Sequence, residues 1–166
     1  MPDQRVIEQV VGIFGMNNVT YRMHENKRSL LVPFGSTGVF VDFVDFNEST
    51  VIGLRSYVLQ NVDATGERRA KILEELNELN KRVRFGKFYF DFDTNMVLLE
   101  YDLFAEDLQA PEIMGAVAVI ANLADSSDDD LTQKLGSGVR AKDAWDAEQG
   151  KATEGTGTGT GPVVAA

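Results

Sequence analysis

Two runs of alternating side chains, joined by a short polar turn, constrain the fold of this chain more than any other feature. In residues 87–92 every second position is aromatic, at Phe88, Phe90 and Phe92. In residues 97–103 every second position is again large and apolar or aromatic, at Val97, Leu99, Tyr101 and Leu103. A period of two places such residues on one face of a strand, and Asp93-Thr94-Asn95 suits a tight turn. The pattern predicts a β-hairpin with one buried face.

Helical periodicity lies on both sides of this hairpin. Apolar residues recur at helical spacing in residues 72–82, and Lys81 and Arg82 suit the last turn of that helix. Pro111-Glu112 begins a second helix, because proline at the first helical position loses no hydrogen bond there. Carboxylates oppose the negative end of a helix, so the acidic run at residues 125–130 predicts that this helix ends there. We expect a separate short helix from about Asp128 to Leu135.

The first half of the chain predicts one helix and four strands. Asp3 can cap the helix, and Gly15 ends it near Asn17-Asn18. Turn residues then separate four runs of strand-forming residues, 19–23, 29–34, 39–46 and 50–59. Because helices and strands do not alternate one for one, the order predicts an α+β domain with an antiparallel sheet packed by helices, not a parallel doubly wound sheet.

Composition divides the chain in two. Residues 1–136 hold the core expected of one domain. Residues 137–166 contain a Gly/Thr repeat without a periodic apolar face and predict a flexible tail, whose deletion should leave stability almost unchanged. Trp145 lies in this segment, and we interpret it as a solvated tail residue, with a partner-binding anchor as the alternative.

The net charge of −10 argues against binding to nucleic acid or to an anionic membrane, because both depend on clustered lysine and arginine. The chain has no cysteine, so disulfides and thiolate metal sites are excluded. The N-terminus lacks the pattern of a signal peptide, and no apolar run is long enough to span a bilayer. We expect a cytoplasmic protein.

Candidate catalytic residues are few. His24 is the only histidine, and a catalytic histidine needs partners that the sequence does not show, so we interpret it as a surface residue. Gly35-Ser36-Thr37-Gly38 lacks the lysine of a phosphate-binding loop and is read as a turn. We therefore predict no enzyme, no catalytic residue and no cofactor.

Two groups of carboxylates invite a metal interpretation. The segment 91–95 begins like a calcium loop, and Asp102 falls at the twelfth place, but Met96 stands where that loop needs glycine. Asp42, Asp45 and Glu48 also share one region, without an identifiable fourth ligand. We favour a hairpin turn and a solvated edge, and predict no metal site.

The second half of the chain, with its predicted helix and hairpin, resembles a known family. The helix at residues 72–80, the glycine before the aromatic strand at residues 86–93, and the acidic second strand at residues 97–103 resemble the YbjN domain family. That family of proposed bacterial sensory-transduction regulators is similar in fold to type III secretion chaperones. The resemblance covers residues 6–135 and implies the order α-β-β-β(-β)-α-β-β-α. Because residues 19–60 offer one strand more than that order requires, residues 39–59 can form one bent hairpin.

The resemblance implies a protein without established catalysis that forms homodimers and holds extended segments of a partner protein. The residues agree, because Val39, Val41 and Phe43 alternate with Phe40, Val44 and Phe46, so this strand is apolar on both faces. Either the chain's own helices or a partner can cover the second face. The leading hypothesis is a homodimeric, chaperone-like adaptor or stress or sensory regulator that binds a protein. The alternative is a small-ligand or cation sensor that uses Asp42, Asp45, Asp91 and Asp93.

Overall fold

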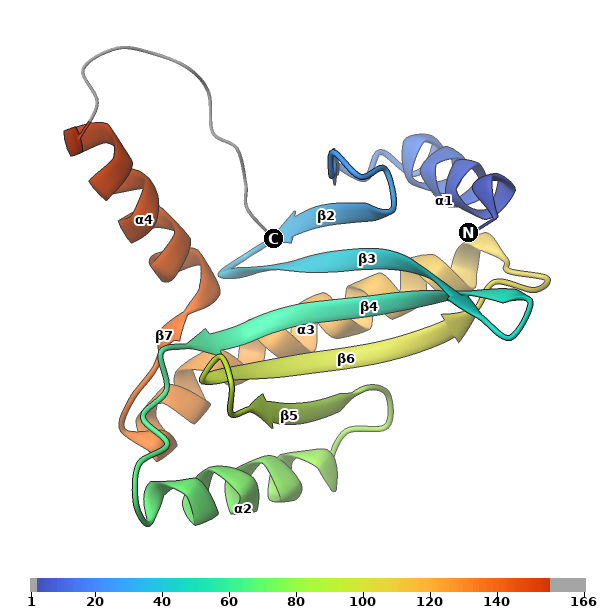
Figure 1. Ribbon diagram of the computed structural model, residues 1–166. Coiled ribbons are helices and arrows are strands. Elements are labelled where there is room, and N and C mark those ends of the chain that lie inside the picture. Colours follow the sequence, from blue (N-terminus) through green and yellow to red (C-terminus); the bar gives the residue numbers. More distant parts are fainter. Residues whose placement is uncertain (1–2, 156–166) are drawn as a thin grey trace.

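The computed structural model describes residues 3–155, and the side chains of residues 3–148 (Figure 1). Within these residues, no helix is long and apolar enough to cross a bilayer. The elements in chain order are α1 (Gln4–Met16), β1 (Arg22–Met23), β2 (Ser29–Phe34), β3 (Thr37–Phe46), β4 (Ser49–Gln60), α2 (Arg68–Asn80), β5 (Lys87–Asp91), β6 (Met96–Phe104), α3 (Ala110–Leu135), β7 (Val139–Arg140) and α4 (Ala141–Gly155).

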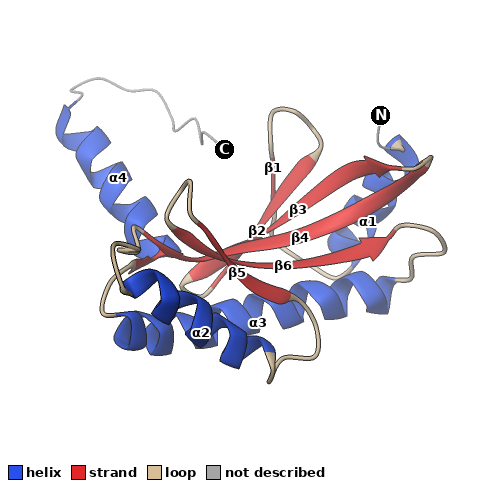
Figure 2. Ribbon diagram, turned by 60° about the horizontal axis from the view of Figure 1, so that its bottom comes forward, coloured by secondary structure: helices blue, strands red, loops and turns tan. Residues whose placement is uncertain are grey.

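One antiparallel sheet forms the centre of the molecule, with strands in the order β1-β2-β3-β4-β6-β5. The short strand β7 pairs with the end of β4. Helices α1 and α3 cover one face of the sheet, and α2 lies beside β5 (Figure 2). The core between sheet and helices contains Val10, Phe14, Val41, Ile52, Leu54, Leu99, Ile113 and Ile120, all with at most 1% exposure. The predicted α+β class with an antiparallel sheet is confirmed.

Residues 87–103 and residues 39–59 each form a hairpin. Phe88 and Phe90 are buried on β5, and Phe90 pairs with the buried Val97 of β6. Strands β3 and β4 form a second hairpin, whose turn residues Asn47 and Glu48 have φ values of 46° and 69°. Two positive φ values are typical of the two-residue turn that matches the twist of antiparallel strands. Residues 39–59 are therefore one hairpin of two long strands.

Helix α3 is longer than the sequence indicated. The expected break at residues 125–130 was wrong, because one continuous helix runs from Ala110 to Leu135 and ends at Gly136 in the left-handed conformation. Asp125 accepts hydrogen bonds from the backbone N–H and the hydroxyl of Ser36 in the β2–β3 turn, and the same hydroxyl is also hydrogen-bonded to Asp128. Asp130 forms an ion pair of 2.9 Å with Lys134. Partners for these carboxylates offset the repulsion that predicted the break.

Ordered structure continues past the boundary expected at residue 136. Strand β7 and helix α4 follow, and Ala141 and Ala144 are buried. The interpretation of Trp145 as a solvated tail residue was wrong, because its ring packs edge to face on Phe40, with centroids 6.4 Å apart. Residues 156–166, which hold most of the Gly/Thr repeat, lie outside the described residues, and a tail there stays a prediction.

Candidate functional site

The face of the sheet opposite α1 and α3 carries no long helix over most of its area (Figures 1 and 2). We call it the open face. Strand alternation and register place on it Phe40, Asp42, Val44 and Phe46 of β3, Val51, Gly53, Arg55 and Tyr57 of β4, and Leu98, Glu100, Asp102 and Phe104 of β6. Along the strands this face divides into a covered end, a charged row and an apolar end.

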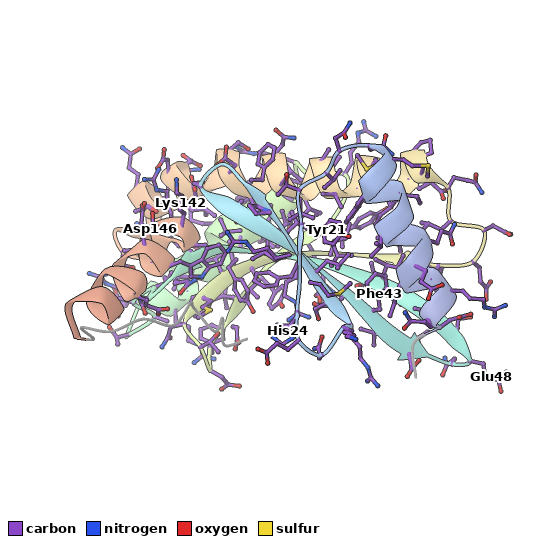
Figure 3. All side chains as sticks on the ribbon, turned by 90° about the horizontal axis from the view of Figure 1, so that it is seen from above. Tyr21, His24, Phe43, Glu48, Lys142 and Asp146 are labelled. Carbon is purple, nitrogen blue, oxygen red and sulfur yellow. The ribbon has the colours of Figure 1, made fainter. Side chains whose placement is uncertain are left out.

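Helix α4 covers one end of the open face. Trp145 lies on Phe40, and Phe40 packs edge to face on Tyr57 with centroids 5.2 Å apart. Figure 3 shows α4, with Lys142 and Asp146, at one end of the molecule and the β3–β4 turn, with Glu48, at the other. The chain therefore covers the aromatic residues at the α4 end of the face with its own helix.

A charged row crosses the middle of the open face. The Arg55 guanidinium lies 3.5 Å from the Asp42 carboxylate and 4.0 Å from Glu100, and Lys87 lies 3.4 Å from Glu100. Ser29 Oγ donates to Asp42 at 2.6 Å. Burial opposes the charge of Arg55, but Asp42 and the other groups around it hold the pKa of Arg55 above its ordinary value. Such partly exposed pairs add little stability, so their main effect is to keep this part of the face polar.

The apolar end of the open face is only partly covered by the described residues. It consists of Val44, Phe46, Val51 and Phe104. Val44 pairs with Val51, which pairs with Phe104, so these three form one row across three strands. Val44 is 50% exposed, Phe46 52% and Phe104 64%. Contiguous exposed apolar side chains of this kind mark interaction surfaces more often than isolated ones do.

The two edges of the sheet offer a partner strand little to pair with. At the β2 edge, the Phe43 N–H donates to the carbonyl of Arg28. Because hydrogen bonds alternate along an antiparallel pair, the backbone polar groups of Ser29, Leu31 and Pro33 point away from β3. Strand β1 pairs with Leu31, the His24 N–H donates to the carbonyl of Ser29, and Pro33 has no N–H to donate.

A side chain occupies the opposite edge, at β5. Asn80, the last residue of α2, donates from Nδ2 to the carbonyl of Phe88 at 2.9 Å. Its Oδ1 accepts from the Phe88 N–H at 2.8 Å. The amide of Asn80 thus makes the two hydrogen bonds that a neighbouring strand would make. With both edges obstructed, the open face is the better candidate surface.

The carboxylates considered as cation ligands are not gathered into one site. Asp91 accepts from Asp93 N–H at 2.9 Å and from Thr94 Oγ1 at 2.7 Å in the β5–β6 turn, and these bonds hold its pKa below the ordinary value. Asp42 lies on β3, which is separated from β5 by two strands, and is bound to Arg55 and Ser29. Among residues 3–148 no three His, Asp or Glu side chains are placed to hold one metal ion.

The remaining candidates also have local structural roles. His24 Nδ1 accepts from the Asn26 N–H at 3.3 Å in the β1–β2 turn. Gly35 and Ser36 form the β2–β3 turn, as expected. Gly53 and Phe104 were not predicted from the sequence as site residues. Phe104 could have been predicted as a site residue, because it lies on the same face of its strand as the polar residues Glu100 and Asp102.

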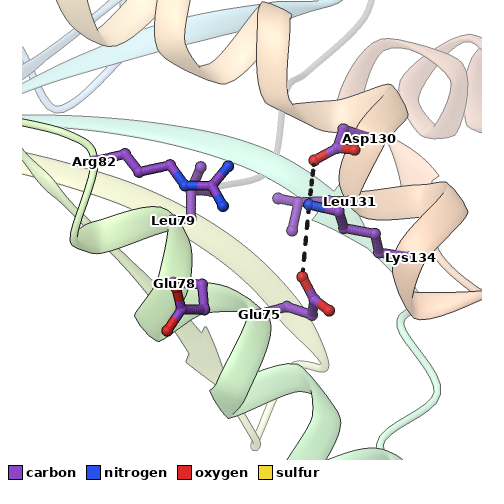
Figure 4. Close-up of a pocket in the computed structure, with 7 residues that line it drawn as sticks. All are labelled: Glu75, Glu78, Leu79, Arg82, Asp130, Leu131 and Lys134. Atoms are coloured by element: carbon purple, nitrogen blue, oxygen red, sulfur yellow. Dashed lines mark ion pairs between the residues drawn. The ribbon is translucent and has the colours of Figure 1, made fainter.

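Two hollows lie on the helical side of the molecule. A crevice between α2 and α3 holds the Lys134 ion pairs with Glu75 at 3.6 Å and Asp130 at 2.9 Å (Figure 4). Its free volume of about 10 Å³ admits roughly one water molecule. A shallower hollow of about 430 Å³ lies between residues 82–85 and the outer side of α3. Neither gathers the groups of a catalytic site.

Comparison with solved structures shows the same fold elsewhere. A crystal structure of the ExsC–ExsE complex matches with a TM-score of 0.57 and 19% identity, over 77% of this chain and 95% of that chain. A crystal structure of YbjN from E. coli matches with a TM-score of 0.54 and 10% identity, over 74% of this chain and 90% of that chain. No curated protein matches the chain. The chain therefore has the α+β fold that these two solved structures share.

A family model then gives the specific assignment. It matches residues 3–144, which is most of the chain. The chain belongs to the TY-Chap1 family, described as T3SS (YopN, CesT) and YbjN peptide-binding chaperone 1. This confirms the family resemblance of residues 6–135. The match is longer at both ends, since it begins just before helix α1 and ends within helix α4.

Proposed function

We propose that this protein binds an extended segment of a partner protein on the open face of its sheet and performs no catalysis. The observation that carries the proposal is the apolar end, where Val44, Val51 and Phe104 form a row whose two outer residues are at least half exposed. Burying such side chains stabilises a complex by about 25 cal/mol for each Å² of apolar surface removed from water. An apolar side chain of an extended partner can be buried against this row.

Family membership and fold support the same function. The family is described as peptide-binding, and one structure of the same fold is a complex of ExsC with ExsE. Within this class, we propose a cytoplasmic adaptor or regulator whose output depends on the partner it holds. The obstructed edges at Pro33 and Asn80 favour contact through side chains on the face over strand addition at an edge.

Peptide selection tests the proposal. A displayed library of random dodecapeptides is selected on the full chain, and enriched peptides are measured against Phe104→Ser. We expect at least a tenfold loss of affinity, because a large exposed anchor is removed from the surface. Met16→Ser is the matched control, since Met16 is 78% exposed but lies at the end of α1. Enrichment of no peptide, or equal binding by parent and Phe104→Ser, would exclude this surface.

We also propose a homodimer, with the interface on α3, because the apolar end of the open face, on β3, is assigned to the partner segment. Light scattering at tens of micromolar is expected to give twice the 18.3 kDa mass of one chain. A mass of one chain at that concentration would contradict it, and would leave the peptide-binding proposal to be decided by the selection experiment.

A further inference from the structure

A notch lies beside the apolar end. Gly53 of β4 pairs with Asp42 on one side and with Asp102 on the other. At the position where a Cβ would stand, the only heavy atoms of residues 3–148 within 4 Å, apart from those of Gly53 and its two chain neighbours, are Asp102 Oδ1 at 3.4 Å and the Asp42 carbonyl oxygen at 4.0 Å. The missing side chain therefore leaves open space above the backbone between two carboxylates.

The charge of the notch is not balanced by the chain. Asp42 is bound to Arg55 and Ser29, but Asp102 is exposed and makes no ion pair or hydrogen bond with its side chain among residues 3–148. Arg55, the cation of the adjacent row, is already shared between Asp42 and Glu100. An additional positive group fits this place electrostatically, and a negative group is repelled.

The notch and the apolar row have the spacing of an extended chain. Val51 and Gly53 are two residues apart on β4, which is about 6.5 to 7 Å along a strand. Alternate side chains of an extended partner have the same spacing. A partner that runs along β4 therefore places one side chain on Val51 and the next side chain of the same face in the notch.

We propose that the partner segment is cationic, with a lysine or arginine two residues from an apolar anchor. The anchor lies on Val51 and Phe104, and the cation enters the notch at Gly53 and pairs with Asp102. This inference rests on the proposed function, because it specifies the chemistry of the segment held on the open face. It adds a condition that general peptide binding does not require.

Charge-swapped peptides test the inference. Each peptide from the selection is synthesised as selected and with every Lys and Arg replaced by Glu, and binding to the full chain is followed by fluorescence anisotropy at low and high salt. We expect enrichment of Lys or Arg two positions from an apolar residue, weaker binding at high salt, and loss of binding on charge swap. Equal binding by swapped peptides would overturn the inference and leave the proposed function standing.

Two variants locate the cation. Asp102→Asn removes the unpaired charge and is expected to weaken the selected peptides about two- to fivefold, the range of an exposed ion pair. Gly53→Val fills the notch and should weaken them further. Asp93→Asn, an exposed aspartate in the β5–β6 turn, is the matched control and should bind like the parent.

Folding and assembly are checked on the same variants. Asp102→Asn changes an exposed side chain, so it decides the inference even if Gly53→Val fails to fold. Unchanged affinity in a folded Asp102→Asn protein would overturn the assigned contact. If Phe104→Ser or Asp102→Asn instead converts a dimer to a monomer in light scattering, the occupant of this surface is a second copy, and the inference is overturned. If the peptides lose affinity for Phe104→Ser but their binding does not depend on charge, the proposed peptide binding stands and the inference of a cationic segment is overturned.

Discussion

At the scale of single residues, Phe90 is a buried side chain of the β5–β6 hairpin. It is 7% exposed and packs edge to face on Phe92 with centroids 4.7 Å apart. Phe90→Ala is expected to destabilise the protein by about 3 to 5 kcal/mol, because transfer and cavity costs add. Urea unfolding measures this value, with Phe46→Ala at the half-exposed apolar end as the control. A loss below about 1 kcal/mol would show that the core tolerates the cavity.

Ser36 presents a different residue-scale problem, because its hydroxyl has one proton for two carboxylates. Its Oγ lies 2.6 Å from Asp125 Oδ1 and 2.5 Å from Asp128 Oδ2. Asp128 is 2% exposed, and burial raises its pKa, whereas hydrogen bonds from Ser36 lower the pKa of Asp125. The arrangement is satisfied when Asp128 is protonated and donates to Ser36, which in turn donates to Asp125.

This arrangement gives a pH dependence with a defined sign. Because the folded-state pKa of Asp128 is raised, its stabilising contribution is full below its unfolded pKa and is lost as pH rises through the folded pKa. Asp128→Asn keeps a donor for Ser36 and cannot ionise, so it should be more stable than the parent at pH 7, by a margin that shrinks towards pH 4. Chemical denaturation across pH measures the margin, with exposed Asp129→Asn as control. A constant difference at all pH values would contradict the raised pKa of Asp128.

At the scale of elements, the contact between α2 and β5 depends on one side chain. Asn80→Ala removes two hydrogen bonds to Phe88 and exposes a donor and an acceptor at the sheet edge. We expect a loss of about 1 to 3 kcal/mol in unfolding free energy and increased self-association, because unpaired edges template further strands. Asn77→Ala, on the exposed side of α2, is the control. Denaturation and sedimentation measure the two effects, and a variant like the control in both would show that the edge needs no cover.

The elements also show where sequence patterns were sufficient. Strands β5 and β6 were predictable because alternation, turn residues and burial all agree locally. The continuity of α3 was not, since the partner that accommodates Asp125 lies 89 residues away, at Ser36. Side-chain acidity indicates a helix end only when the acids face solvent. The fold class was therefore readable from local patterns, and the length of α3 depended on a tertiary contact.

At the scale of the whole molecule, the candidate site was half predictable. Because β3 is apolar on both faces, the sequence indicated a second surface that needs cover. In the structure, α4 covers one end of that surface and the other end faces solvent. Phe40 lies under Trp145, whereas Val44 and Phe46 stay exposed. The pairing of β7 with β4 sets where α4 begins. No local sequence pattern therefore shows which end of the open face α4 covers. The notch at Gly53 was equally hidden, since its neighbours come from β3 and β6.

The packing of α4 argues against the expectation that deleting residues 138–166 leaves stability almost unchanged. Trp145→Ala removes the ring that covers Phe40 and is expected to lower unfolding free energy by about 2 kcal/mol, below the cost for a fully buried tryptophan because Trp145 is only partly buried. For a chain of this size, that corresponds to about 4 to 8 °C in melting temperature. Scanning calorimetry of the full chain measures the shift, with exposed Lys142→Ala on the same helix as control. An unchanged melting temperature would mean that α4 does not hold the covered end, and that the whole open face is available to a partner.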